Sequence, residues 1–149
     1  MNLRKLQHSN PLTFYNASVT TEVEIPLVFS KVSAGFPSPA DDFLDLNIDL
    51  NKHLVKNQYT TFFVKVSGNS MQDVGISDGD ILIVDKSLEP ADNKIAVCYI
   101  DGDFTVKRIK VEKDCVWLVA ENPDYKPIKV TDENELIIWG VVINVIKYL

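Results

Sequence analysis

Short apolar runs, separated by clusters of glycine, aspartate, asparagine and proline, dominate the chain beyond residue 60. Runs rich in valine, isoleucine, phenylalanine and tryptophan are typical of β-strands. They predict strands at 61–66, 80–85, 95–100, 104–111, 116–119 and 136–146. Asp101-Gly102, between two of these runs, is a strong signal for a two-residue hairpin turn. We therefore expect one compact, mainly β domain.

The amino-terminal part has a different pattern. Residues 1–18 are polar without a clear period, which predicts a flexible arm. Between Val23 and Phe29 apolar residues alternate along an extended segment, and Pro26 restricts this segment to an edge or isolated strand. The arm is therefore not expected to be a helix-turn-helix.

A glycine and two prolines between Gly35 and Pro39 exclude regular structure there and mark a boundary. Ser38 can cap a helix that begins at Pro39, with two aspartates in its first turn. The pattern predicts one short helix near 39–46.

Composition narrows the functional classes. The 149 residues carry 15 basic and 21 acidic side chains, and the net charge of −6 disfavours strong direct DNA binding. No apolar run is long enough for a signal peptide or a membrane span, which predicts a cytoplasmic protein without membrane contact. Cys98 and Cys115 lie in apolar runs without metal-site spacing, so we expect buried, reduced thiols and neither a metal nor a cofactor.

One candidate for chemistry is the turn from Ser67 to Met71, directly after a predicted strand. A glycine and an asparagine at the end of a strand make a tight turn, which can expose the hydroxyl of Ser70 beside free backbone N–H groups. Such a hydroxyl is placed like a nucleophile. Ordinary turn chemistry explains the same residues, and spacing alone leaves both interpretations open.

A nucleophilic serine needs a base, and the two histidines, His8 and His53, lie in polar contexts that suit a surface position. A lysine serves only where burial lowers its pKa. Lys107 alternates with Thr105 and Ile109 on a predicted strand, whereas Arg108 lies on the opposite face. Periodicity does not decide which face is buried, so an exposed Lys107-Arg108 pair is the alternative.

Three segments in this order resemble the LexA and UmuD family of self-cleaving proteins: 64–71, 75–80 and 101–107. In that family a serine in a Ser-Gly-x-Ser-Met turn is the nucleophile and a lysine some three dozen residues later is its base. The resemblance implies a serine peptidase in which Ser70 and Lys107, 37 positions apart, have these roles, with the Met71 N–H as an oxyanion donor. The segment 139–147 is similar to the family's last strand.

The family cuts a bond between a small residue and glycine in its own arm. Ala34-Gly35 is the only Ala-Gly pair in this chain, and an ordinary loop is the alternative interpretation. Small side chains let the backbone approach a nucleophile closely. The resemblance thus implies a cleavable arm at 1–34 and a self-cleavage and dimerisation domain at 35–149.

Within the family, the sequence after Gly35 is more similar to the UmuD branch than to LexA, and the 34 preceding residues lack the helical pattern of a DNA-binding domain. This implies a homodimer that is cut during the SOS response on contact with a RecA filament on single-stranded DNA. The product would then bind a UmuC-type translesion polymerase. The alternatives are a LexA-like repressor fragment, a signal-peptidase-like protease, which would need a membrane anchor, and a catalytically inactive β interaction module.

Overall fold

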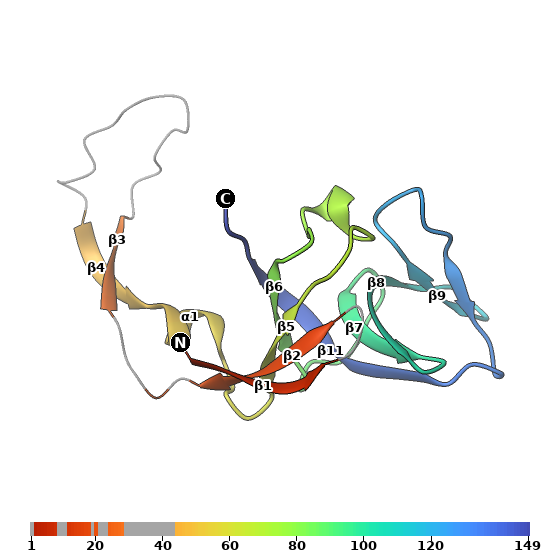
Figure 1. The fold of residues 1–149 in the computed structure, drawn as a ribbon, viewed down its shortest axis with the longest axis horizontal. Helices are drawn as coiled ribbons and strands as arrows, with labels where there is room; N and C mark the ends of the chain where they lie inside the picture. The colour runs from red at the N-terminus through yellow and green to blue at the C-terminus, as the bar shows by residue number, and fades with distance from the viewer. Residues whose placement is uncertain (1, 9–11, 19, 21–23, 29–43) are drawn as a thin grey trace.

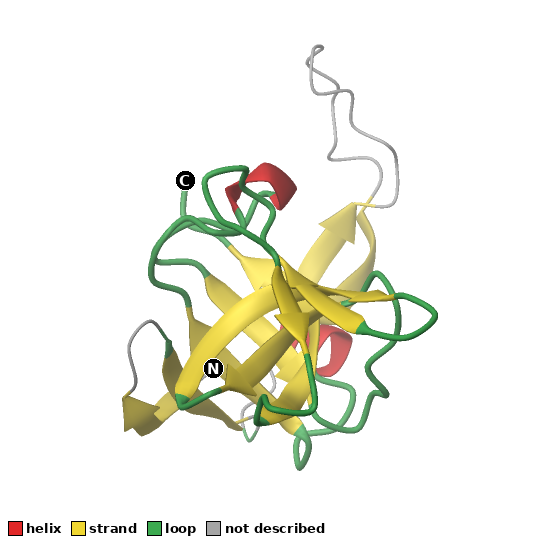
Figure 2. Ribbon diagram, turned by 90° about the vertical axis from the view of Figure 1, so that its right-hand side faces the viewer, coloured by secondary structure: helices red, strands yellow, loops and turns green. Residues whose placement is uncertain are grey.

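The computed structural model describes residues 2–8, 12–18, 20, 24–28 and 44–149. Figure 2 shows a body made mostly of strands, and Figure 1 shows a pair of strands that stands apart from it. The body is a nine-stranded antiparallel sheet of β1 (Asn2–His8), β2 (Thr13–Ser18), β5 (Thr61–Lys65), β6 (Ile81–Asp85), β7 (Ile95–Ile100), β8 (Asp103–Val111), β9 (Val116–Val119), β10 (Ile128–Val130) and β11 (Leu136–Ile146). The separate pair is β3 (Glu24–Val28) and β4 (Leu44–Asp49), and the helical segments are α1 (Leu50–Leu54) and the 3₁₀ turn η2 (Gln72–Val74).

The strand pattern beyond residue 60 is confirmed. Every predicted strand is present, with ends that agree to within one residue. β7 and β8 form the predicted hairpin, in which Ile100 pairs with Asp103 and the two turn residues have φ of 49° and 97°. Two positive φ angles in a two-residue loop define the turn that matches strand twist. The pattern missed only β10, a strand of three residues.

β11 joins the two halves of the large sheet, because its first part pairs with β7 and its second part with β6. Both pairings contain a register shift. At Gly140 an added Cβ would lie 2.8 Å from Val84 Cγ1 and 3.0 Å from the backbone oxygen of Asp85. Only glycine allows this close approach of β11 to β6. The expected last strand of the family is thus present, and its glycine has a packing reason.

The sheet curls so that strands distant in its order meet in one aromatic core. The ring of Phe14 on β2 lies 4.8 Å from that of Phe104 on β8 and 5.4 Å from that of Trp139 on β11. Phe14 is 1% exposed. Truncating such a buried ring to alanine typically costs about 3–5 kcal/mol. β2 is therefore part of the core that supports the remaining sheet.

This finding corrects the expectation of an arm without regular structure at 1–18. β1 and β2 form an antiparallel pair, and β2 continues the sheet by pairing with β5. The missed signal is short: Leu12 and Phe14 are buried, and they alternate with the half-buried Thr13 and Tyr15. Two apolar residues at period two are too few to stand out among polar neighbours.

The helix predicted near 39–46 is also misplaced. Residues 44–46 belong to β4, and 39–43 lie outside the described residues. The helix is α1, where Asp49 caps the first turn by accepting a hydrogen bond of 2.9 Å from the Asn51 N–H. Leu44 to Asp49 alternate strictly between apolar and polar residues, a strand pattern that overrides the capping signal before it. The expectation for Pro26 is confirmed, because among the described strands β3 lies at the edge of a two-stranded sheet with β4.

The two thiols differ in their surroundings. Cys98 is fully buried, as expected, whereas Cys115 is half-buried, with its sulfur 3.4 Å from Glu112 Oε2, which corrects the prediction for that residue. Both thiols are free. In the described ranges, no helix has the length and apolar character needed to cross a membrane.

Candidate active site

The side chain of Lys107 on β8 is buried. It is 6% exposed and lies opposite Ala96 of β7 in the sheet register. Its neighbour Arg108 is half-buried and forms an ion pair with Glu121. The structure thus answers the question that periodicity left open: the lysine is the buried residue of the pair.

Three oxygen atoms surround the Lys107 ammonium nitrogen. Nζ donates to Thr105 Oγ1 at 2.6 Å and to the backbone oxygen of Val106 at 3.0 Å, and it lies 3.4 Å from Ser70 Oγ. Burial lowers the pKa of Lys107, because the low-polarity surroundings penalise its charge. Burial also raises the pKa of Cys98 to about 12, so this thiol is neutral and supplies no counter-charge near pH 7.

Ser70 lies in the turn that leaves β5. Gly68 has a φ of 93°, and its N–H donates to Asp78 Oδ1 at 2.7 Å, which fixes the first half of the turn. Met71, 2% exposed, anchors the second half in the core. Among the described residues, the Met71 N–H has no hydrogen-bond acceptor. The turn therefore presents a half-buried hydroxyl beside a backbone donor.

The serine and the lysine open onto a groove. A cleft of about 300 Å³ is lined by Ser67, Gly68, Asn69, Ser70, Thr105, Lys107 and Tyr125. A second cleft of about 350 Å³ shares Thr105, Lys107 and Tyr125 with the first and continues to Ile100 and Ile128. The shared residues make the two clefts one surface channel with polar and apolar walls. Such a channel has room for a short extended peptide segment.

Two residues that the sequence did not single out contact the serine turn. Asn122, 3% exposed, donates from Nδ2 to the backbone oxygen of Asn69 at 3.0 Å. The Tyr125 hydroxyl donates to Asn69 Oδ1 at 2.8 Å. These partners are 53 and 56 positions away from Asn69. Asn122 to Tyr125 look like ordinary loop residues, so no local pattern indicated this contact.

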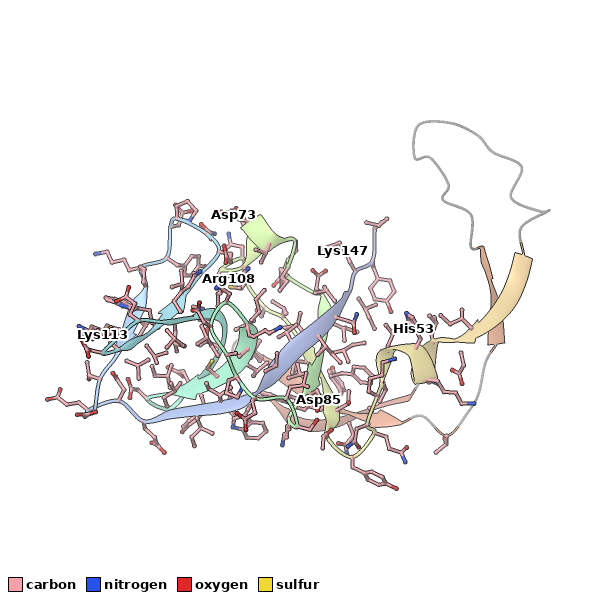
Figure 3. The ribbon with its side chains drawn as sticks, turned by 180° about the vertical axis from the view of Figure 1, so that it is seen from behind. His53, Asp73, Asp85, Arg108, Lys113 and Lys147 are labelled. Carbon is pink, nitrogen blue, oxygen red and sulfur yellow. The ribbon has the colours of Figure 1, made fainter. Side chains whose placement is uncertain are left out.

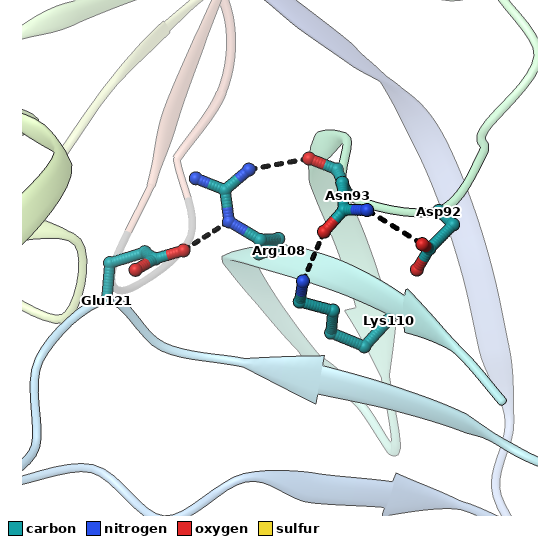
Figure 4. A network of polar contacts seen from close by, with 5 residues as sticks. All are labelled: Asp92, Asn93, Arg108, Lys110 and Glu121. Carbon is teal, nitrogen blue, oxygen red and sulfur yellow. Dashed lines mark hydrogen bonds and ion pairs between the residues drawn. The ribbon is translucent and has the colours of Figure 1, made fainter.

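A polar network around Arg108 and Lys110 of β8 holds the same loop (Figure 4). Arg108 forms an ion pair with Glu121 through Nε and donates from Nη1 to the backbone oxygen of Asn93 at 2.5 Å. The Asn93 side chain accepts from Lys110 and donates to Asp92 at 2.7 Å. Arg108 thus connects β8 to the segment that contains Asn122 and Tyr125.

The other residues that the sequence singled out are the proposed cleavage site and the histidines. Ala34 and Gly35 lie outside the described residues. His53 is exposed, as expected for a surface histidine (Figure 3). Within the described part of the chain, no group of three or more histidine, cysteine, aspartate or glutamate side chains is arranged to hold a metal ion.

Comparison with known proteins identifies the family. The model of the Peptidase S24-like family matches residues 26–143. Protein MucA of Salmonella typhimurium is 37% identical over 131 residues, which cover 87% of this chain and 88% of MucA. Protein SamA of Salmonella typhimurium is 39% identical over 117 residues, 78% of this chain and 81% of SamA. LexA repressor 1 of Pseudomonas putida is 39% identical over 127 residues, 85% of this chain and 62% of the repressor. The chain therefore belongs to the Peptidase S24-like family, as a UmuD-type member of the LexA and UmuD group.

Proposed function

We propose that the chain is a self-cleaving serine peptidase in which Ser70 cuts the Ala34–Gly35 bond with Lys107 as general base. The observation that carries this proposal is the buried Lys107 Nζ, 3.4 Å from Ser70 Oγ in a groove. A lysine accepts a proton only in its neutral form, and burial lowers its pKa in that direction. A productive proton transfer needs a contact of about 2.6–3.2 Å, so the gap closes when the scissile segment fills the groove.

In the proposed reaction, Ser70 Oγ attacks the carbonyl carbon of Ala34 while its proton passes to Lys107 Nζ. The oxyanion of the tetrahedral intermediate accepts a hydrogen bond from the Met71 N–H. The Lys107 ammonium then protonates the departing nitrogen of Gly35, and Ala34 remains as an ester on Ser70. Water, deprotonated by Lys107, hydrolyses that ester and restores the serine.

The oxygens of Thr105 and Val106 have a defined part in this cycle. They accept hydrogen bonds from Nζ and therefore hold its position while its charge changes. They are neutral acceptors, so they orient the amine without the strong pKa increase that a carboxylate would cause. This arrangement suits a base that must be neutral when Ser70 attacks and cationic when the Gly35 nitrogen departs.

The biological role that we propose is that of the UmuD branch. Contact with a RecA filament on single-stranded DNA stimulates the cut, which removes residues 1–34 of the 149 and leaves a homodimeric form of 115 residues in the cytoplasm. This form binds a UmuC-type translesion polymerase. The similarity to MucA and SamA over most of the chain supports this assignment.

Transcriptional repression is the second candidate, because LexA repressor 1 is 39% identical over 127 residues. A shift of operator-like DNA by the purified chain alone would favour this function over the polymerase role. The net charge of −6 argues against it, since an acidic chain repels phosphate backbones.

The direct test is the mass of the purified full chain after incubation with RecA, nucleotide and single-stranded DNA. The proposal predicts fragments of 34 and 115 residues. Gly35→Glu is the control for the bond, because a bulky charged side chain there keeps the backbone away from Ser70. Efficient cutting of this variant, or a chain that stays intact in every condition, would contradict the proposal.

A further inference from the structure

The loop Glu121 to Tyr125 makes three contacts with the segment that contains Ser70. Asn122 Nδ2 bonds the backbone oxygen of Asn69, the Tyr125 hydroxyl bonds Asn69 Oδ1, and the backbone oxygen of Glu121 accepts from the Asp73 N–H at 2.9 Å. The bonds bracket the serine, because Asn69 precedes it and Asp73 follows three residues later. The loop therefore acts as a clamp on both sides of the nucleophile.

The clamp is itself tied to the strand that carries the lysine. Arg108 forms an ion pair with Glu121 on one face of β8, and the adjacent Lys107 faces Ser70 on the other. Glu121 connects two residues that Figure 3 labels. Its backbone oxygen accepts a hydrogen bond from the Asp73 N–H, and its side chain forms the ion pair with Arg108. β8 therefore carries the Lys107 amine, and through the ion pair of Arg108 with Glu121 it also holds the clamp on the serine turn.

Within the clamp, Tyr125 has a position that a purely structural residue would not need. Its side chain lines both clefts of the groove, and its exposed fraction is 42%. A side chain this exposed adds little to the core, and its hydroxyl bonds the Asn69 amide oxygen. Serine attack is sensitive to small displacements, so a bond that restrains the preceding residue acts on the rate.

We propose that Tyr125 is a positioning residue for self-cleavage, which restrains Asn69 so that Ser70 Oγ faces Lys107 Nζ. This inference rests on the proposed peptidase function. It assigns Tyr125 no proton transfer: the phenol acts through Asn69 and not on the scissile bond. Its loss is expected to slow the attack while the acid–base properties of Lys107 stay the same.

The test compares self-cleavage rates of the full chain between pH 7 and 10 for wild type, Tyr125→Phe, Asn69→Ala and the double variant. Tyr125→Phe should be about tenfold slower at every pH, with an unchanged pH midpoint and melting temperature. The double variant should be no slower than the slower single variant, since both changes remove the same bond. Tyr59→Phe, at a tyrosine that is 89% exposed, is the matched control and should cleave like wild type.

Each possible outcome supports or contradicts the proposed role of Tyr125. A Tyr125→Phe rate within twofold of wild type would overturn it, and so would additive effects in the double variant, which would indicate that Tyr125 contacts the substrate instead. A lowered melting temperature with a normal rate for the folded chain would assign Tyr125 a structural role only. These results leave the peptidase function intact, whereas a wild-type chain that never cleaves contradicts both proposals.

Discussion

Two turns that each follow a strand of the sheet differ in how far their own residues define them. The hairpin turn Asp101-Gly102 has two positive φ angles and joins the paired strands β7 and β8, and Asp101 also forms hydrogen bonds with Asn134 and Glu135. The turn that ends in Ser70 has one positive φ, at Gly68, and the side chains of Asp78, Asn122 and Tyr125 form hydrogen bonds with it. Contacts with distant residues hold both turns, but the Asp-Gly sequence by itself marks the hairpin turn, whereas no local pattern marks the two side chains that hold the serine turn opposite Lys107.

The largest expected effect concerns the hydroxyl itself. Ser70→Ala should lower self-cleavage by at least about a thousandfold, because no other group in the proposed mechanism attacks the bond. Its melting temperature should stay that of wild type, since the half-buried hydroxyl contributes little to packing. Product formation is followed by mass spectrometry, with Ser87→Ala, at an exposed serine outside the groove, as the control. Residual cleavage by Ser70→Ala at the wild-type rate would remove Ser70 from the mechanism.

A matched pair of glycine substitutions separates the two turns. Gly68→Ala and Gly102→Ala each place a side chain at a positive φ, 93° and 97°, with no atom within 4 Å of the new Cβ. Each should therefore lower the free energy of unfolding by about 1–2 kcal/mol. Only Gly68→Ala should also slow self-cleavage, because it shifts the turn that carries Ser70. Equal cleavage rates in the two variants would show that the difference between the turns has no functional meaning.

A smaller effect is expected in the pH dependence of stability. The pKa of Lys107 is lowered in the folded chain, so between that pKa and the ordinary value of 10.5 the unfolded state binds more protons. The contribution of Lys107 to the free energy of unfolding therefore rises with pH between these two pKa values. Lys107→Met should unfold at higher denaturant concentration than wild type at neutral pH, and the difference should shrink as the pH approaches 10.5. A constant difference from pH 7 to 10.5 would contradict the lowered pKa.

The same contrast explains what the sequence could predict. Strands beyond residue 60 and the Asp101-Gly102 hairpin follow from local patterns, and the structure confirms them. The buried face of Lys107 did not follow from periodicity, because apolar residues occupy both faces of β8. Contacts of Asn122 and Tyr125 depend on how the sheet curls, which no local pattern contains. The pattern did not predict β2, because its buried apolar signal consists of Phe14 and of Leu12 just before the strand.

The most direct test of the central claim is the rate of self-cleavage against pH, without RecA, for wild type and Lys107→Arg. If Lys107 is the base, the wild-type rate should rise about tenfold per pH unit until the apparent pKa is passed, because only the neutral amine accepts the serine proton. Lys107→Arg should stay intact throughout, since a guanidinium remains protonated. Lys107→Ala should fail in the same way, and melting curves establish that both variants fold. Cleavage of Lys107→Arg at the wild-type rate between pH 9 and 10 would contradict the account.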